Sequence, residues 1–148
     1  MRISLTKWLL VLLLIAIGYA AWNEWRPYDW HPDAGSRYHI AGVAVTPDHG
    51  HHWVEVHLKR TGEAEHDLEK PVRLLLGSDR ELQPADTSLT GGPDQGTAEL
   101  WFKFWLDPGD LTGPLRLRLN DGDLCVKATP GEPAMGSSGR RYFNSTHW

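Results

Sequence analysis

The segment most suggestive of metal chemistry is a histidine-rich turn, Asp48-His49-Gly50-His51-His52. Imidazole is the commonest side-chain ligand for copper, zinc and nickel. We therefore treat His49, His51 and His52 as a candidate metal site, with His39 or His57 as a further ligand. The spacing matches no closed site, however, and Asp and Gly are the residues that a tight turn prefers. Two interpretations stay open, a polar β-turn and a metal site, and the pattern favours the turn.

Sequence motifs for catalysis are missing. The chain has no Gly-x-Ser-x-Gly elbow, no phosphate-binding glycine-rich loop and no His-Glu-x-x-His pair. Its single cysteine, Cys125, lies on a predicted strand without an identifiable base beside it, and one cysteine forms no internal disulfide. We predict a protein that is not an enzyme and uses no cofactor.

A second candidate site is an aromatic surface on two alternating segments, residues 52–59 and 97–106. In a strand, alternate side chains point to opposite faces. One face of these segments carries Val, Leu and Phe, and the other, here called the aromatic face, carries Trp53, Glu55, His57, Trp101, Lys103 and Trp105. Exposed aromatic patches mark contacts with partners, ligands or membranes. Three interpretations stay open: the chain covers this face itself, a protein or membrane partner binds it, or sugars stack on the indoles.

A third candidate is a basic face, on which Arg73, Arg116, Arg118 and Lys127 alternate with core residues. Such a face attracts anionic lipid headgroups or an acidic partner. A solvated strand face is the commoner meaning of the same pattern.

These residues lie among short alternating runs separated by turns, which indicates an all-β domain. We predict strands over residues 37–46, 52–59, 72–76, 81–89, 97–106, 115–119 and 124–127, with Asp121-Gly122 in a hairpin turn. About seven strands within residues 37–129 predict a single immunoglobulin-like β-sandwich. The predicted core between its sheets comprises Val54, Val56, Leu58, Leu100, Phe102, Phe104, Leu115, Leu117 and Leu119. In that strand order the second and fifth strands are neighbours, which brings the three indoles of the aromatic face together.

A hydrophobic helix is predicted in front of this domain, within residues 1–22. Arg2 and Lys7 precede an uncharged run, residues 8–22. Two interpretations fit: an uncleaved signal-anchor that contacts the membrane through residues 8–22, or a signal peptide cleaved near Ala20. Both keep the basic end in the cytoplasm and export the rest. We expect a single-pass protein of the bacterial inner membrane with its C-terminal domain in the periplasm or outside, or alternatively a secreted protein.

Two aromatic segments flank the predicted domain. Residues 23–36 read as a linker rich in aromatic residues and proline, and residues 130–148 as a linker followed by an aromatic tail. The tail carries Tyr142, Phe143 and Trp148, which we expect to pack on or near the aromatic face.

Charge argues against nucleic acid as a partner. The 148-residue chain has a net charge of −4, and without Arg2 and Lys7 the exported part carries −6. Binding to phosphates needs a positive surface. Together these features predict a membrane-tethered, extracytoplasmic β-sandwich that acts as a non-catalytic interaction module of a bacterial envelope, binding an envelope protein. The alternatives are a periplasmic metal-binding protein that uses the histidine-rich turn and a carbohydrate-binding module that uses the exposed tryptophans.

Overall fold

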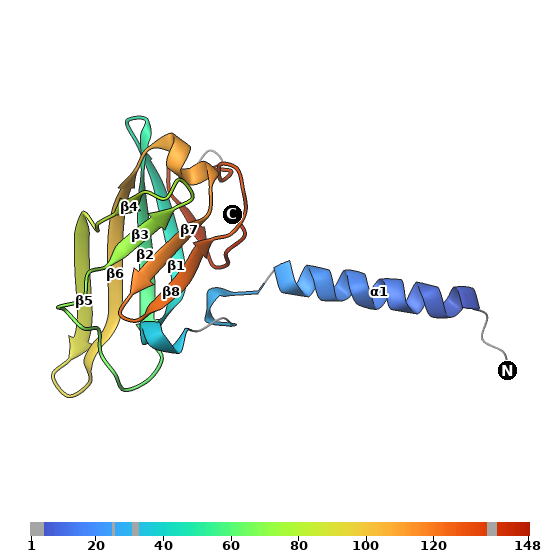
Figure 1. Cartoon of the computed structure of the whole chain (residues 1–148), viewed down its shortest axis with the longest axis horizontal. Helices are drawn as coiled ribbons and strands as arrows, with labels where there is room; N and C mark the ends of the chain where they lie inside the picture. Colours follow the sequence, from blue (N-terminus) through green and yellow to red (C-terminus); the bar gives the residue numbers. More distant parts are fainter. Residues whose placement is uncertain (1–4, 25, 31–32, 136–138) are drawn as a thin grey trace.

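The computed structural model describes residues 5–24, 26–30, 33–135 and 139–148, and places one helix ahead of a β-domain (Figure 1). Helix α1 spans Leu5–Glu24 and projects away from the strands. Its window Leu5–Trp22 has a mean hydropathy of 1.8 and is 0% buried. At about 1.5 Å per residue such a helix is long enough to cross most of a bilayer core. By length and composition, α1 therefore fits a signal-anchor or membrane span.

The rest of the described chain is mostly β. The strands are β1 Tyr38–Asp48, β2 His51–Arg60, β3 Arg73–Leu76, β4 Glu81–Leu82, β5 Asp86–Gly92, β6 Gly96–Leu106, β7 Leu115–Leu119, β8 Gly122–Lys127 and β9 Arg141–Phe143. Three short 3₁₀ helices complete the fold: η1 Tyr28–Trp30, η2 Ala34–Ser36 and η3 Pro108–Thr112.

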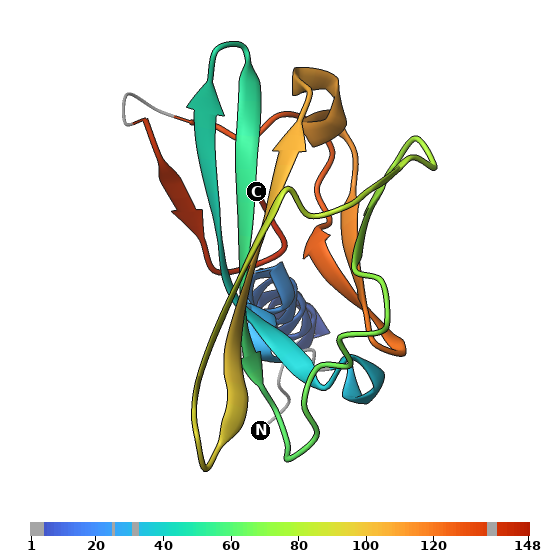
Figure 2. The same cartoon turned by 90° about the vertical axis from the view of Figure 1, so that its left-hand side faces the viewer.

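The strands form two antiparallel sheets that pack over one core (Figure 2). The larger sheet has the order β5-β6-β2-β1-β9, and the smaller has the order β4-β3-β7-β8. All nine residues predicted to lie between the sheets are buried, which confirms the alternation assigned to β2, β6 and β7. Apolar residues at every second position of both sheets supply this core, and their removal from water is its main driving force.

The predicted fourth strand, residues 81–89, is two strands. β4 joins the smaller sheet and β5 joins the larger, so the chain crosses between the layers around Pro84. Proline has no backbone N–H to donate to a ladder, which suits it to such a crossing.

The hairpin between β7 and β8 turns one residue earlier than predicted. Leu119 pairs with Gly122, which leaves Asn120 and Asp121 in the turn, and Asn120 takes the left-handed φ of 53°. Gly122 instead starts β8 against η2, where an added Cβ would lie 2.4 Å from the backbone nitrogen of Ser36. This position therefore selects glycine for close packing rather than for the turn.

A β-bulge corrects the predicted position of Lys127. The β7–β8 register shifts between Leu115, which pairs with Lys127, and Arg116, which pairs with Cys125. Val126 is the extra residue, so it and Lys127 both lie on the buried side. Lys127 is therefore not part of the basic face. Its ammonium donates to the carbonyl of Thr129 and lies 5.8 Å from the ring centroid of Trp148.

The two flanking segments pack into the β-domain. Pro27 forms a bridge with Ser145, and the amide of Tyr28 donates to the carbonyl of Asn144 at 3.0 Å. β9 pairs with the outer edge of β1, while Tyr28 and Trp148 enter the core. The segments before and after the predicted strands therefore contact each other and form part of the β-domain.

Candidate functional site: the outer face of the larger sheet

The outer surface of β2 and β6 gathers all six residues of the aromatic face. Trp53 lies opposite Trp105, and His57 lies opposite Trp101. Between these pairs, Glu55 lies opposite Lys103. Directly opposed side chains on neighbouring strands are close enough to interact, so the register alone builds one continuous surface.

Ring stacking fixes this surface. The ring centroids of Trp53 and Trp105 are 4.4 Å apart with planes at 63°, whereas His57 stacks on Trp101 at 4.4 Å and 4°. His51 stacks on Trp105 at 4.9 Å, and the Lys103 ammonium lies 4.8 Å from the Trp53 centroid. The three indoles are half-buried by these neighbours. A sugar platform needs open, coplanar indoles, so this packing disfavours sugar stacking.

Three polar contacts join charged groups of this surface to their neighbours. His57 Nε2 lies 2.6 Å from Oε2 of Glu99, and an Arg140 guanidinium nitrogen lies 2.9 Å from Oε1 of Glu55. Trp53 Nε1 donates to Asp48 at 3.0 Å. Hydrogen bonds from His49 and Trp53 lower the pKa of the Asp48 carboxyl. Ring contacts and ion pairs therefore hold the side chains of this surface in place.

The tail packs near the aromatic face, as predicted, but it does not cover that face. β9 lies beside the aromatic face, as the edge strand next to β1, and Tyr142 keeps 72% of its surface exposed. Phe143 stacks on Trp148 at 4.6 Å, and this pair belongs to the core. Arg140 reaches the aromatic face by an ion pair with Glu55. The tail instead pairs with the edge of β1 and adds Trp148 to the core, because these positions give it backbone hydrogen bonds and deeper burial.

A shallow groove results between the tail and the aromatic face. Its floor is the small residues Gly42 and Ala44 of β1, and its sides are His57 with Trp101 and Tyr142 with Arg140. Glu55, Ala44 and Tyr142 occupy one row across β2, β1 and β9.

The histidine-rich segment forms the tight turn between β1 and β2. His49 and Gly50 take φ values of 46° and 81°, which suits a two-residue hairpin. His49 contacts Asp48, His51 Nε2 lies 3.1 Å from Asp107, and His52 faces the opposite side of β2, opposite Leu106. Within the described part of the chain, no group of three His, Cys, Asp or Glu residues is arranged to hold a metal ion.

The basic face is smaller than predicted and lies on the smaller sheet. Arg118 approaches Glu81 at 3.5 Å and Asp123 at 3.4 Å, and Arg116 approaches Asp123 at 3.9 Å. Arg73 donates to the carbonyl of Val72. These neighbouring acids offset the positive field that a basic face needs to attract anions.

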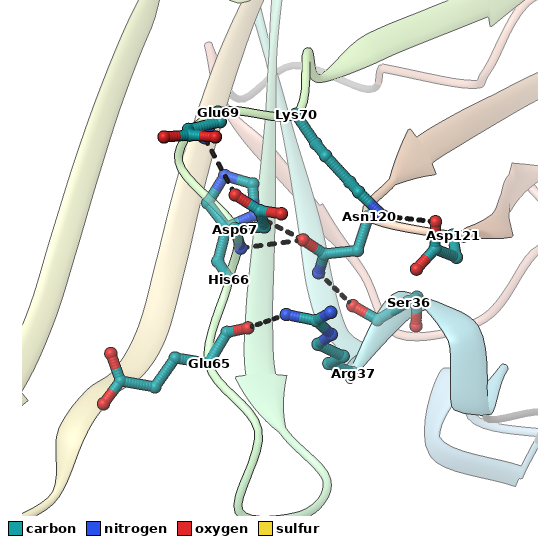
Figure 3. Close-up of polar contacts among 9 residues, drawn as sticks. All are labelled: Ser36, Arg37, Glu65, His66, Asp67, Glu69, Lys70, Asn120 and Asp121. Carbon is teal, nitrogen blue, oxygen red and sulfur yellow. Dashed lines mark hydrogen bonds and ion pairs between the residues drawn. The ribbon is translucent and has the colours of Figure 1, made fainter.

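A polar network that sequence reasoning missed is centred on Asn120 (Figure 3). Its Oδ1 lies 2.9 Å from both His66 Nδ1 and the amide of Asp67, and its Nδ2 donates to the Ser36 carbonyl at 2.6 Å. The β2–β3 loop and η2 are thereby attached to the β7–β8 turn. Asn120 is buried and its amide is hydrogen-bonded on both sides, so this network stabilises the fold. The partners come from segments 54 and 84 residues away, which no local pattern reveals.

Comparison with protein-family models, with curated proteins and with solved structures gave no match in any of the three. The interpretation of the aromatic face therefore depends on its own geometry.

Proposed function

We propose that this protein is a membrane-tethered, non-catalytic interaction module of a bacterial envelope, with α1 in the inner membrane and the β-domain in the periplasm or outside. The observation that carries the proposal is that every residue of the window Leu5–Trp22 is exposed, beside a β-domain that has its own core. An apolar helix of this length is stable when lipid replaces the missing protein contacts.

An immunoglobulin-like sandwich is the proposed architecture, and the strand order supports it. With β1 to β8 taken as strands A, B, C, C′, D, E, F and G, the sheets have the orders D-E-B-A and C′-C-F-G. This is the arrangement expected of that architecture, with β9 added beside strand A. The architecture alone hosts many functions, so the partner surface must be argued from its side chains.

The aromatic face is the proposed partner surface. Trp and Arg dominate binding energy in protein interfaces, and here half-buried tryptophans lie beside Arg140 and Lys103. Stacking and ion pairs hold these side chains in place before binding, which lowers the entropy lost when a partner docks. The partner that fits this surface is an envelope protein with an apolar centre and a polar rim.

A fusion experiment tests the location. Alkaline phosphatase fused after Trp148 should be active, and green fluorescent protein at the same point should be dark, because these reporters need opposite sides of the membrane. The untagged protein should stay in the membrane pellet after alkaline carbonate washing. A fluorescent fusion, or a soluble cytosolic pool of the protein, would contradict the proposal.

A crosslinking experiment tests the partner surface. A photoreactive amino acid at Lys103, on the aromatic face, should give a discrete adduct in cells. The photoreactive amino acid placed at position 116 instead of Arg116, which is exposed on the opposite sheet, is the matched control and should not give that adduct. Equal adducts from both positions would mean that the aromatic face is not the binding surface.

A further inference from the structure

A small cleft of about 240 Å³ lies beside the chain that leaves the anchor helix. Ile40 of β1 and Leu124 of β8 line it, together with Arg26, Tyr28, Cys125 and His147. The lining is mostly apolar, and among the described lining residues Arg26 is the permanent cation and none is a carboxylate.

Arg26 is the chemically unusual residue of this cleft. Its Nε is buried and has no hydrogen-bond partner in the described structure. The guanidinium carbon lies 5.7 Å from the ring centroid of Trp30, and the side chain as a whole is half-buried and lines the cleft. A half-buried guanidinium that lines a cleft without a carboxylate among its lining residues favours a ligand that brings an anionic oxygen.

Position identifies the source of that oxygen. Helix α1 ends at Glu24, and Trp22 contacts Trp30 edge-to-face at 5.4 Å. These two indoles are 55% and 51% exposed, and tryptophan is typical of the membrane–water interface. The bridge between Pro27 and Ser145 holds the next residues against the domain. With α1 in the membrane, the cleft lies at the level of the lipid headgroups.

We propose that this cleft binds the phosphate of an anionic phospholipid headgroup through Arg26, an inference that rests on the proposed membrane anchoring. The planar guanidinium matches two phosphate oxygens, and Thr146 and His147 at the cleft supply further polar groups. The glycerol and first acyl carbons lie against Ile40 and Leu124. A net anionic lipid is favoured over a zwitterionic one because the cleft supplies a cation without a carboxylate.

Cys125 provides the probe, because it is exposed, lines the cleft and is the only cysteine of the chain. Full-length protein is placed in nanodiscs of phosphatidylcholine, with or without phosphatidylglycerol, and alkylated with a small uncharged maleimide. We expect alkylation to be severalfold slower when phosphatidylglycerol is present. Equal rates in the two lipids would overturn the proposal without any variant. Anchoring is tested separately, because insertion into phosphatidylcholine discs does not depend on the cleft.

Two variants separate the cleft from a general surface effect. Arg26→Gln should lose the protection, and Lys59→Gln, which removes an exposed cation of β2, should keep it. A slowing of equal size in Arg26→Gln would overturn the proposal. A last measurement adds inorganic phosphate to phosphatidylcholine discs, to test whether a free anion protects Cys125. Protection as strong as that from phosphatidylglycerol would assign the cleft to a free anion and overturn the lipid assignment.

Discussion

The indole Nε1 of Trp148 donates a hydrogen bond of 2.7 Å to the hydroxyl of Tyr28, 120 residues earlier in the chain. Tyr28 donates in turn to the carbonyl of Val126, from which the same indole nitrogen is 3.0 Å away. Burial raises the pKa of the Tyr28 hydroxyl, which keeps it a neutral donor. Both chain segments that flank the strands are thereby attached to β8 at one end of the core.

This contact predicts unequal effects within the tail. Trp148→Ala should lower the free energy of unfolding by about 3 kcal/mol or more, because it removes a buried indole and leaves the Tyr28 hydroxyl with one partner fewer. Tyr142→Ala, two residues into β9, should cost less than about 0.5 kcal/mol, because its ring is exposed. Urea denaturation followed by fluorescence compares the two. Similar costs would mean that the tail acts only as an edge strand.

The centre of the core gives a second prediction. Phe102 is 1% exposed and lies between the sheets, so Phe102→Ala should cost roughly 3–5 kcal/mol. Ser88→Ala on the exposed strand β5 should change stability by less than about 0.5 kcal/mol. Thermal and urea unfolding of both variants measure the difference. A small effect of Phe102→Ala would contradict the assigned core.

Lys127 gives a prediction about pH. Burial lowers the pKa of its ammonium, so the folded protein releases this proton at lower pH than the unfolded chain does. The unfolded chain then binds more protons, and the free energy of unfolding rises as pH increases from the folded pKa toward the unfolded value of about 10.4. Lys127→Met should be more stable than the wild type at neutral pH, because it does not bury an ammonium, and it should lack this rise.

Urea denaturation of both proteins at neutral pH and at about pH 10 tests this prediction. The advantage of Lys127→Met should shrink at the higher pH. If the advantage of Lys127→Met does not change with pH, the pKa of Lys127 is the same in the folded and unfolded chain. The contacts with the Thr129 carbonyl and the Trp148 ring would then offset the effect of burial on the ammonium.

Gly122 gives a prediction about close packing. A Cβ at this position would lie 2.4 Å from the Ser36 nitrogen, so Gly122→Ala should cost about 1–3 kcal/mol and loosen η2. Gly109→Ala in η3 is the control, because nothing lies within 4 Å of its added Cβ. Hydrogen exchange of residues 33–37 should increase only in the first variant. Unchanged exchange would mean that η2 moves aside without cost.

Alternation predicted the strands that carry the aromatic face, because β2 and β6 are half-buried and regular over ten and eleven residues. The same reasoning failed where the backbone departs from a period of two. At the Val126 bulge, one extra residue moved Lys127 from the outer to the inner face.

Long-range partners were beyond local patterns. The composition of the tail indicated that it would dock, and it does, but local sequence does not say whether aromatic residues pack on an outer face or complete a core. Tyr28 and Trp148 become core residues through contacts with Val126, which lies 98 residues after Tyr28 and 22 residues before Trp148. The network around Asn120 likewise depends on three segments that meet only in the folded protein.

The bridge between Pro27 and Ser145 limits how far the β-domain can move from the end of α1. With α1 ending at Glu24, three residues span at most about 10 Å between the helix and the bridge. If α1 is anchored, the domain diffuses with its helix and searches for partners in two dimensions. It contacts only proteins in the same membrane or within roughly one domain diameter of it, and its effective concentration for them is raised accordingly.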